Sequence, residues 1–160
     1  MAETVYELEF YVDPETGDAP VTRWFLEELS PVARRLLGAA MDAVLQRDGV
    51  GVCDTEFGKQ LGGGIFEFRV KGNPQAVIDE ERSRRGKQPK KIDPPAEAVL
   101  LRVFCHAYGS KVVLLLGGYD KASDPSPKRQ NKEIETARAR LRMFLEARKK
   151  AAKAEKRGRT

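Results

Sequence analysis

The segment between residues 97 and 116 constrains the fold more than any other part of the chain. Residues 97–108 predict a strand whose one face is wholly apolar, made of Val99, Leu101, Val103, Cys105 and Ala107. Residues 108–111 then predict a short hairpin link, and Val112–Leu116 is apolar on both faces. A strand of that kind lies in the interior of a sheet, so this hairpin needs further strands beside it and helices over it.

The remaining elements follow from local patterns. Residues 5–12 alternate as a strand with one buried side, and residues 57–61 and 65–70 predict two strands joined by Gly62-Gly63-Gly64. Pro20 and Ser30-Pro31 predict the starts of two helices that form a hairpin, and a last helix is expected from about Asn131 past Leu145. Because nearly all links are short, we expect an α+β fold: a small antiparallel twisted sheet packed by an N-terminal helical hairpin and a C-terminal helix.

The length of 160 residues suits one domain, which we place at residues 1–146. Residues 72–96 are rich in Gly, Pro and charge but poor in large apolar residues, and we expect a mobile basic insertion there, with a short helical piece around 76–82. Residues 147–160 are expected to be a fraying basic tail.

The net charge of +5 is modest, but its distribution is informative. The excess of Lys and Arg gathers in the insertion and in the tail, which indicates an anionic partner, and RNA is the one we expect. Cys53 and Cys105 have no metal-binding spacing and are read as reduced thiols. There is no signal-peptide pattern and no membrane-spanning run, so the prediction is a cytoplasmic protein without metal, cofactor or membrane partner.

Polar side chains on three strands point away from the apolar stripes. Residues 65–70 offer Glu67 and Arg69, and the neighbouring strands offer Arg102, His106, Tyr119 and Lys121, with Lys59 just before the glycine turn. On adjacent strands these would form a cationic patch suited to metal-free cleavage of an RNA phosphodiester. Arg would neutralise the phosphorane, while Glu67, His106 or a lysine would move protons.

Ordinary structural roles explain several of these residues equally well. A single His on a strand is more often structural than catalytic, Glu67 and Arg69 can form a simple ion pair, and a basic tail is usually only solvated. Arg102 is harder to explain in this way, because it interrupts an apolar strand and needs a partner or a functional cavity.

Several short motifs, taken in order, resemble the phage-derived branch of the RelE/HigB toxin superfamily. They cover residues 5–145 and are Phe10-Tyr11, Pro20-Val21, Lys59-Gln60-Leu61, Gly64-Ile65-Phe66-Glu67-Phe68-Arg69, Leu101-Arg102-Val103-Phe104, Leu115-Leu116-Gly117-Gly118-Tyr119-Asp120-Lys121, and Glu133-Ile134 with Ala137. The usual family pattern is an "lfElR" strand, a "yRv" strand and "hgFxKK" before a helix.

The resemblance implies the toxin of a type II toxin–antitoxin system: an mRNA endonuclease acting at the ribosome and paired with a helix-turn-helix antitoxin. It places Arg102 at the phosphate, Glu67 and Arg69 along the site, and Lys121 among the catalytic cations, with His106 as a further candidate. Lys59, Tyr119, Lys128 and Arg129 are the expected RNA-binding residues.

This chain departs from the family pattern at Ala122, which replaces the second basic residue, at Gly117, which replaces the His, and in the long insertion. The alternative is therefore a relative with attenuated catalysis that binds RNA or protein. A DNA-binding regulator fits poorly, since no helix-turn-helix with a basic recognition helix is evident.

Overall fold

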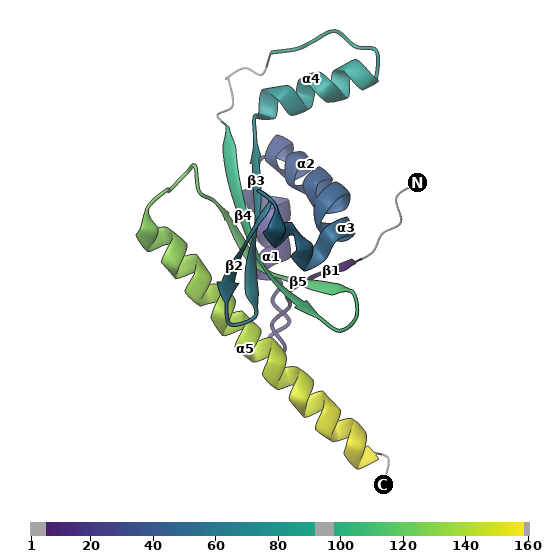
Figure 1. Cartoon of the computed structure of the whole chain (residues 1–160), viewed down its shortest axis with the longest axis vertical. Coiled ribbons are helices and arrows are strands. Elements are labelled where there is room, and N and C mark those ends of the chain that lie inside the picture. Colours follow the sequence, from purple (N-terminus) through teal and green to yellow (C-terminus); the bar gives the residue numbers. More distant parts are fainter. Residues whose placement is uncertain (1–5, 92–97, 159–160) are drawn as a thin grey trace.

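The computed structural model describes residues 6–91 and 98–158, which form a five-stranded mixed sheet with helices on both faces (Figure 1). The strand order is β1 (Glu7–Phe10), β5 (Val112–Asp120), β4 (Val99–Tyr108), β3 (Ile65–Gly72) and β2 (Gly58–Gly62). The α+β class agrees with the prediction, and so does the order of the strands and of the last helix, but a further helix lies between β3 and β4.

The prediction of a purely antiparallel sheet is wrong at one position. Strands β2 to β5 form antiparallel pairs, as their short links require, but β1 pairs with β5 in parallel, with Glu7 opposite Val112 and Phe10 opposite Leu115. The rule that short links favour antiparallel pairing applies only to strands that a tight turn connects. The partner of β1 comes much later in the chain, after several other elements, so no tight turn sets its direction.

Helical segments between β1 and β2 cover one face of the sheet. The first is α1 (Pro20–Arg23), which continues as the π-helical turn η1 (Trp24–Glu28); the second is α2 (Pro31–Ala40), which continues through η2 (Met41–Leu45) and α3 (Gln46–Asp48) to the 3-10 turn η3 (Gly49–Asp54). Ser30 caps α2, because its Oγ accepts a hydrogen bond from the Ala33 N–H at 3.2 Å, and Pro31 occupies the first turn.

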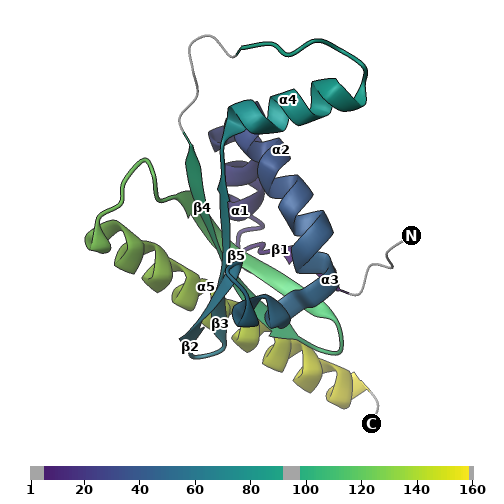
Figure 2. The same ribbon diagram turned by 45° about the horizontal axis from the view of Figure 1, so that its top comes forward.

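The two helical layers lie on opposite faces of the sheet (Figure 2). The Trp24 ring covers Gly118 on one face of β5, whereas the Arg140 guanidinium lies over Gly117 on the other. The main core fills the space between the sheet and α1 to α3, and its members include Leu37, Leu45, Phe66, Phe68, Leu101 and Leu115. The opposite face, under α5 (Pro127–Gly158), carries the polar side chains considered below.

The insertion contains more regular structure than we expected. Helix α4 (Pro74–Arg84) replaces the short piece anticipated at 76–82 and lies next to α2, while residues 85–91 have no regular structure. Part of the predicted mobile segment, residues 92–97, lies outside the described residues. Gly72 pairs directly with Val99, so the whole insertion is a long excursion from a β3–β4 hairpin.

The expectation that the last helix frays beyond Ala147 is also wrong. Helix α5 begins at Pro127, where Ser126 Oγ accepts the Arg129 N–H at 3.2 Å, and it continues to Gly158. Ala, Lys, Arg and Glu are strong helix formers, which explains why a segment with exposed side chains still has a helical conformation. Within the described ranges, no helix combines the length and the apolar character needed to cross a bilayer.

Candidate active site

A buried carboxylate with two arginines above it is the centre of the polar face. Glu67 on β3 is completely buried, and its Oε1 accepts a hydrogen bond from Arg69 Nε at 2.7 Å. Arg102 Nε lies 3.5 Å from the same oxygen, and Gln130 Nε2 of α5 donates to Glu67 Oε2 at 3.4 Å. The charge of Glu67 thus compensates two neighbouring guanidinium groups that would otherwise repel each other.

Strand register brings these residues together. Arg69 is the partner of Arg102 across β3 and β4, and Arg102 is the partner of Tyr119 across β4 and β5. Glu67 lies two residues before Arg69 and therefore on the same face. The guanidinium of Arg129, from the first turns of α5, lies over the Tyr119 ring at 5.3 Å. Five of the nine predicted site residues, Glu67, Arg69, Arg102, Tyr119 and Arg129, thus form one cluster.

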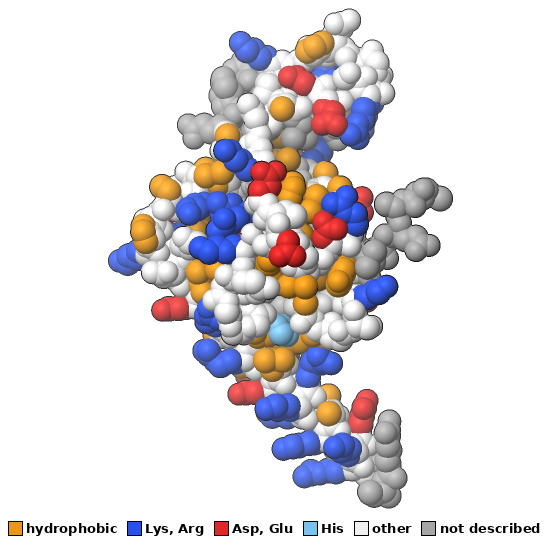
Figure 3. All heavy atoms as spheres, viewed as in Figure 1, with side chains coloured by type: hydrophobic (Ala, Val, Ile, Leu, Met, Phe, Trp, Pro, Cys, Tyr) orange, Lys and Arg blue, Asp and Glu red, His pale blue; other side chains and the backbone are white. Residues whose placement is uncertain are grey.

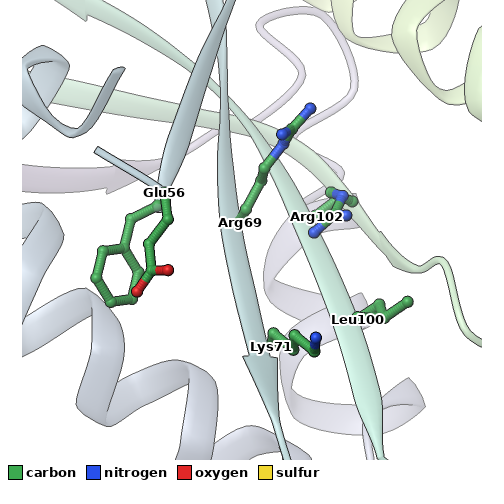
Figure 4. A pocket seen from close by; sticks show the side chains of 6 residues that line it. Glu56, Arg69, Lys71, Leu100 and Arg102 are labelled. Atoms are coloured by element: carbon green, nitrogen blue, oxygen red, sulfur yellow. The ribbon is translucent and has the colours of Figure 1, made fainter. Parts of the chain in front are cut away.

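The cluster opens into a pocket of about 360 Å³ beside the two arginines (Figure 4). Its walls come from β3, β4 and the segment before β2, and its lining residues are Glu56, Phe57, Arg69, Lys71, Leu100 and Arg102. Arg69 and Lys71 project from one strand, and Arg102 projects from the next. Three cations therefore surround a space large enough for a phosphate group and part of a nucleotide.

Two polar atoms of the cluster are buried and lack a hydrogen-bond partner within the part of the chain that the structure describes. They are Arg102 Nε and the Tyr119 hydroxyl. Burial lowers the pKa of Arg102 and raises the pKa of Tyr119, in both cases by disfavouring the charged form. A buried donor without a partner is costly in a folded protein and often marks a place where a ligand binds.

The other predicted residues lie outside the cluster. His106 shares the face of Arg102, but it is four residues further along β4, about 13 Å away. Its Nδ1 is 2.7 Å from the Gly64 carbonyl oxygen, and its ring stacks with Tyr108. Lys59 is exposed on β2 opposite Glu67, Lys121 follows β5, and Lys128 is exposed at the start of α5.

Two pocket residues, Lys71 and Glu56, did not emerge from the sequence. The signal for Lys71 was present, because residues 67, 69 and 71 alternate onto one face of a strand. Glu56 precedes β2 in an irregular segment, and no local pattern links it to β3 or β4. Nowhere among residues 6–91 and 98–158 do three His, Cys, Asp or Glu side chains gather as a metal site requires.

Comparisons with known proteins identify no relative. No family model matches the chain, and no curated protein matches it either. The pocket, the charges around it and the sequence motifs are therefore the features that bear on function.

Proposed function

We propose that this chain is a metal-free endoribonuclease of the toxin type, with a RelE/HigB-like arrangement of sheet and N-terminal helical hairpin. Its substrate is mRNA at the ribosome, in the cytoplasm, and a helix-turn-helix antitoxin restrains it. One observation carries the proposal: Arg69, Lys71 and Arg102 surround an open pocket of about 360 Å³ that Glu56 also lines. Arginine pairs of this kind bind phosphate oxygens with two parallel hydrogen bonds.

The pocket residues assign a role to each step of the cleavage. Arg69 and Arg102 hold the scissile phosphate and stabilise the charge that develops on the phosphorane. Glu56 accepts the proton of the ribose 2′-hydroxyl, whose oxygen then forms a bond to phosphorus. The bond from phosphorus to the 5′-oxygen breaks, and Lys71 Nζ donates a proton to that oxygen. The products are a 2′,3′-cyclic phosphate and a free 5′-hydroxyl.

Glu67 has a positioning role in this scheme. Its carboxylate is completely buried and already accepts hydrogen bonds from Arg69 and Gln130, so RNA in the pocket cannot exchange a proton with it directly. It sets the orientation of Arg69 and offsets the positive charge of Arg102.

Cleavage of a synthetic RNA by purified variants tests the proposal. We expect Arg102→Ala to slow cleavage by on the order of 100-fold, because one well-placed donor contributes about 3 kcal/mol to the transition state. Arg102→Lys should recover little of the loss, since an ammonium group cannot make the planar two-point contact. Lys111→Gln, an exposed change outside the pocket, is the matched control.

In cells, induced expression should arrest growth. Relief of that arrest by co-expression of the adjacent small reading frame would support a toxin function. If the Arg102→Ala variant cleaves RNA as fast as the wild type, the pocket is not the active site.

Ala122 favours the second candidate, an RNA- or protein-binding relative with attenuated catalysis. This exposed residue stands where the family pattern has its second basic group, and its backbone N–H donates to Asp120 Oδ1 at 3.0 Å. It therefore adds no cation to the cluster. RNA binding that depends on Arg102, without RNA cleavage or growth arrest, would identify this second function.

A further inference from the structure

The last turns of α5 leave the body of the protein and are rich in Lys and Arg (Figure 3). We call residues 149–158 the basic arm. Every residue from Arg148 to Gly158 is exposed. Arg148 lies over the Tyr108 ring at 4.5 Å, and Lys150 lines a pocket with Pro14 and Glu15, so the arm leaves the body at about this point. The arm is thus a single helix that projects into solvent.

The charges of the basic arm lie along one side. At 100° per residue, its cations fall within about 120° of one another around the helix axis; they are Lys149, Lys150, Lys153, Lys156 and Arg157. Glu155 lies on the opposite side, and the positions between the two are alanine. The stripe is about 12 Å long, which matches two to three successive phosphates of a nucleic-acid strand.

The composition of the arm distinguishes among polyanions. It contains no aromatic residue, so it cannot stack on the bases of a single strand as single-strand binders do. It has no large apolar residue beyond Leu145, whereas helices that lie on a lipid surface insert Trp, Phe or Leu. Lysines act as point charges toward phosphate, and a duplex presents phosphates at higher density than a single strand does.

The arm is too far from the pocket to contact the nucleotides that are cleaved. Gln130, which contacts Glu67, and Lys150 are 20 residues apart on one straight helix, about 30 Å. Whatever the arm binds therefore lies at a site separate from the pocket.

We propose that the basic arm docks the protein on the phosphate backbone of double-stranded RNA, at a site separate from the pocket. The choice of RNA rests on the proposed function, but the docking itself needs no catalysis. The arm is then a second, sequence-independent binding site for a folded RNA, in a protein that cuts a single strand at the pocket.

The test measures binding of the full chain to a labelled RNA hairpin with a stem of roughly 20 base pairs, over a series of salt concentrations. The double variant Lys149→Gln with Lys153→Gln should weaken binding by on the order of tenfold and reduce the slope of log affinity against log salt by about two. The matched control, Lys111→Gln with Lys132→Gln, removes the same charge from exposed positions elsewhere and should change the slope by less than half as much. Circular dichroism will show retained helix, since Gln and Lys have similar helix propensity.

Equal losses in the two double variants would overturn the proposal, because the effect would then be one of net charge alone. Equal affinity for a single strand of the same length would overturn the choice of a duplex. Arm-dependent binding to anionic phospholipid vesicles, without arm-dependent binding to RNA, would show that the partner is a membrane surface. Cleavage assays separate the two proposals: the docking stands if wild-type protein binds RNA through the arm but does not cut it.

Discussion

At the scale of single residues, Glu67 decides whether the cationic cluster can exist. It is a completely buried carboxylate that compensates two arginines, one of which, Arg102, has a side chain only 13% exposed. Removing one member of a buried ion pair leaves an uncompensated charge, which costs more than the pair itself contributes.

We therefore expect Glu67→Gln to lower the free energy of unfolding by about 3 kcal/mol, as measured by urea denaturation. The control is Glu56→Gln, an exposed carboxylate in the same pocket, which should change the stability by less than about 0.5 kcal/mol. A Glu67→Gln variant as stable as the control would mean that the arginines do not depend on this charge.

Tyr108 provides a second prediction at this scale, at alkaline pH. Burial, and then a hydrogen bond from its hydroxyl to the Glu9 carboxylate, raise its pKa from 10.0 to about 12. The folded state holds this proton more tightly than the unfolded state does. The resulting stabilisation is complete below pH 10 and is lost as the pH rises from about 10 to about 12.

Carbon-13 NMR of labelled tyrosine rings can measure the titration of Tyr108, with Tyr108→Phe to assign its resonance. We expect a midpoint near pH 12 and a lower midpoint in Glu9→Gln, where the charged acceptor is gone. A midpoint at the ordinary value near 10 in the folded wild type would contradict the described contact.

At the scale of elements, glycines decide how closely helical segments approach the sheet. Gly117 and Gly118 of β5 lie against side chains on opposite faces, whereas Gly38 in α2 has more room around it. A methyl group on Gly118 would lie 2.5 Å from the Trp24 ring, so the start of η1 can approach the sheet only because Gly118 has no side chain. Gly38, inside α2, has only Phe25 Cζ at 3.9 Å from the same position, which is ordinary contact.

Gly118→Ala should accordingly destabilise the protein by about 1–3 kcal/mol through overpacking. Gly38→Ala should stabilise it by about 0.5–1 kcal/mol, because alanine loses less backbone entropy in a helix. Thermal unfolding of both variants tests the pair, and a shift of the same sign in each would show that the packing of α1 on β5 is described wrongly.

The elements also show how far sequence patterns reach. Alternation identified the strands around Phe68 and Arg102, because one buried face leaves a period of two in the chain, and a continuous apolar run identified the strand around Leu114. The direction of β1 had no such signal, since its partner strand is distant in the sequence. The far end of α5 was missed for the opposite reason: charge suggested a solvated tail, while the helix propensity of Ala, Lys and Glu favoured helix.

The site was predictable to the extent that it lies on paired strands. Arg69, Arg102 and Tyr119 occupy successive partner positions, so parity alone placed them on one face. The alternation of side chains also placed His106 on the face of Arg102. Alternation gives no distance along a strand, however, and His106 lies too far along β4 to reach the pocket. Glu56 comes from an irregular segment, where position depends on tertiary packing alone.

At the scale of the whole molecule, the insertion is an addition to a complete sheet. Gly72 and Val99 are direct partners on β3 and β4, so residues 73–98 leave the hairpin and return to the same point. A two-residue Asn-Gly turn between these partners is compatible with an antiparallel pair.

Replacing residues 73–98 by Asn-Gly should leave a folded protein. Shortening the loop to this extent recovers roughly 2 kcal/mol of closure entropy, which offsets the lost packing of α4 on α2. We expect the free energy of unfolding to stay within about 2 kcal/mol of the wild type. The same variant reports on RNA: weaker binding with a flatter salt dependence would show that the insertion contacts RNA, and unchanged binding would show that it is inert.

The parallel pairing of β1 with β5 has a consequence for the order in which the protein can be made. During synthesis, residues 7–10 emerge roughly 100 residues before their partner strand, residues 112–115. Until that strand is made, β1 has an unpaired edge, which can associate with other nascent chains. A messenger cut before the codons for residues 112–115 would release a product in which β1 has no partner.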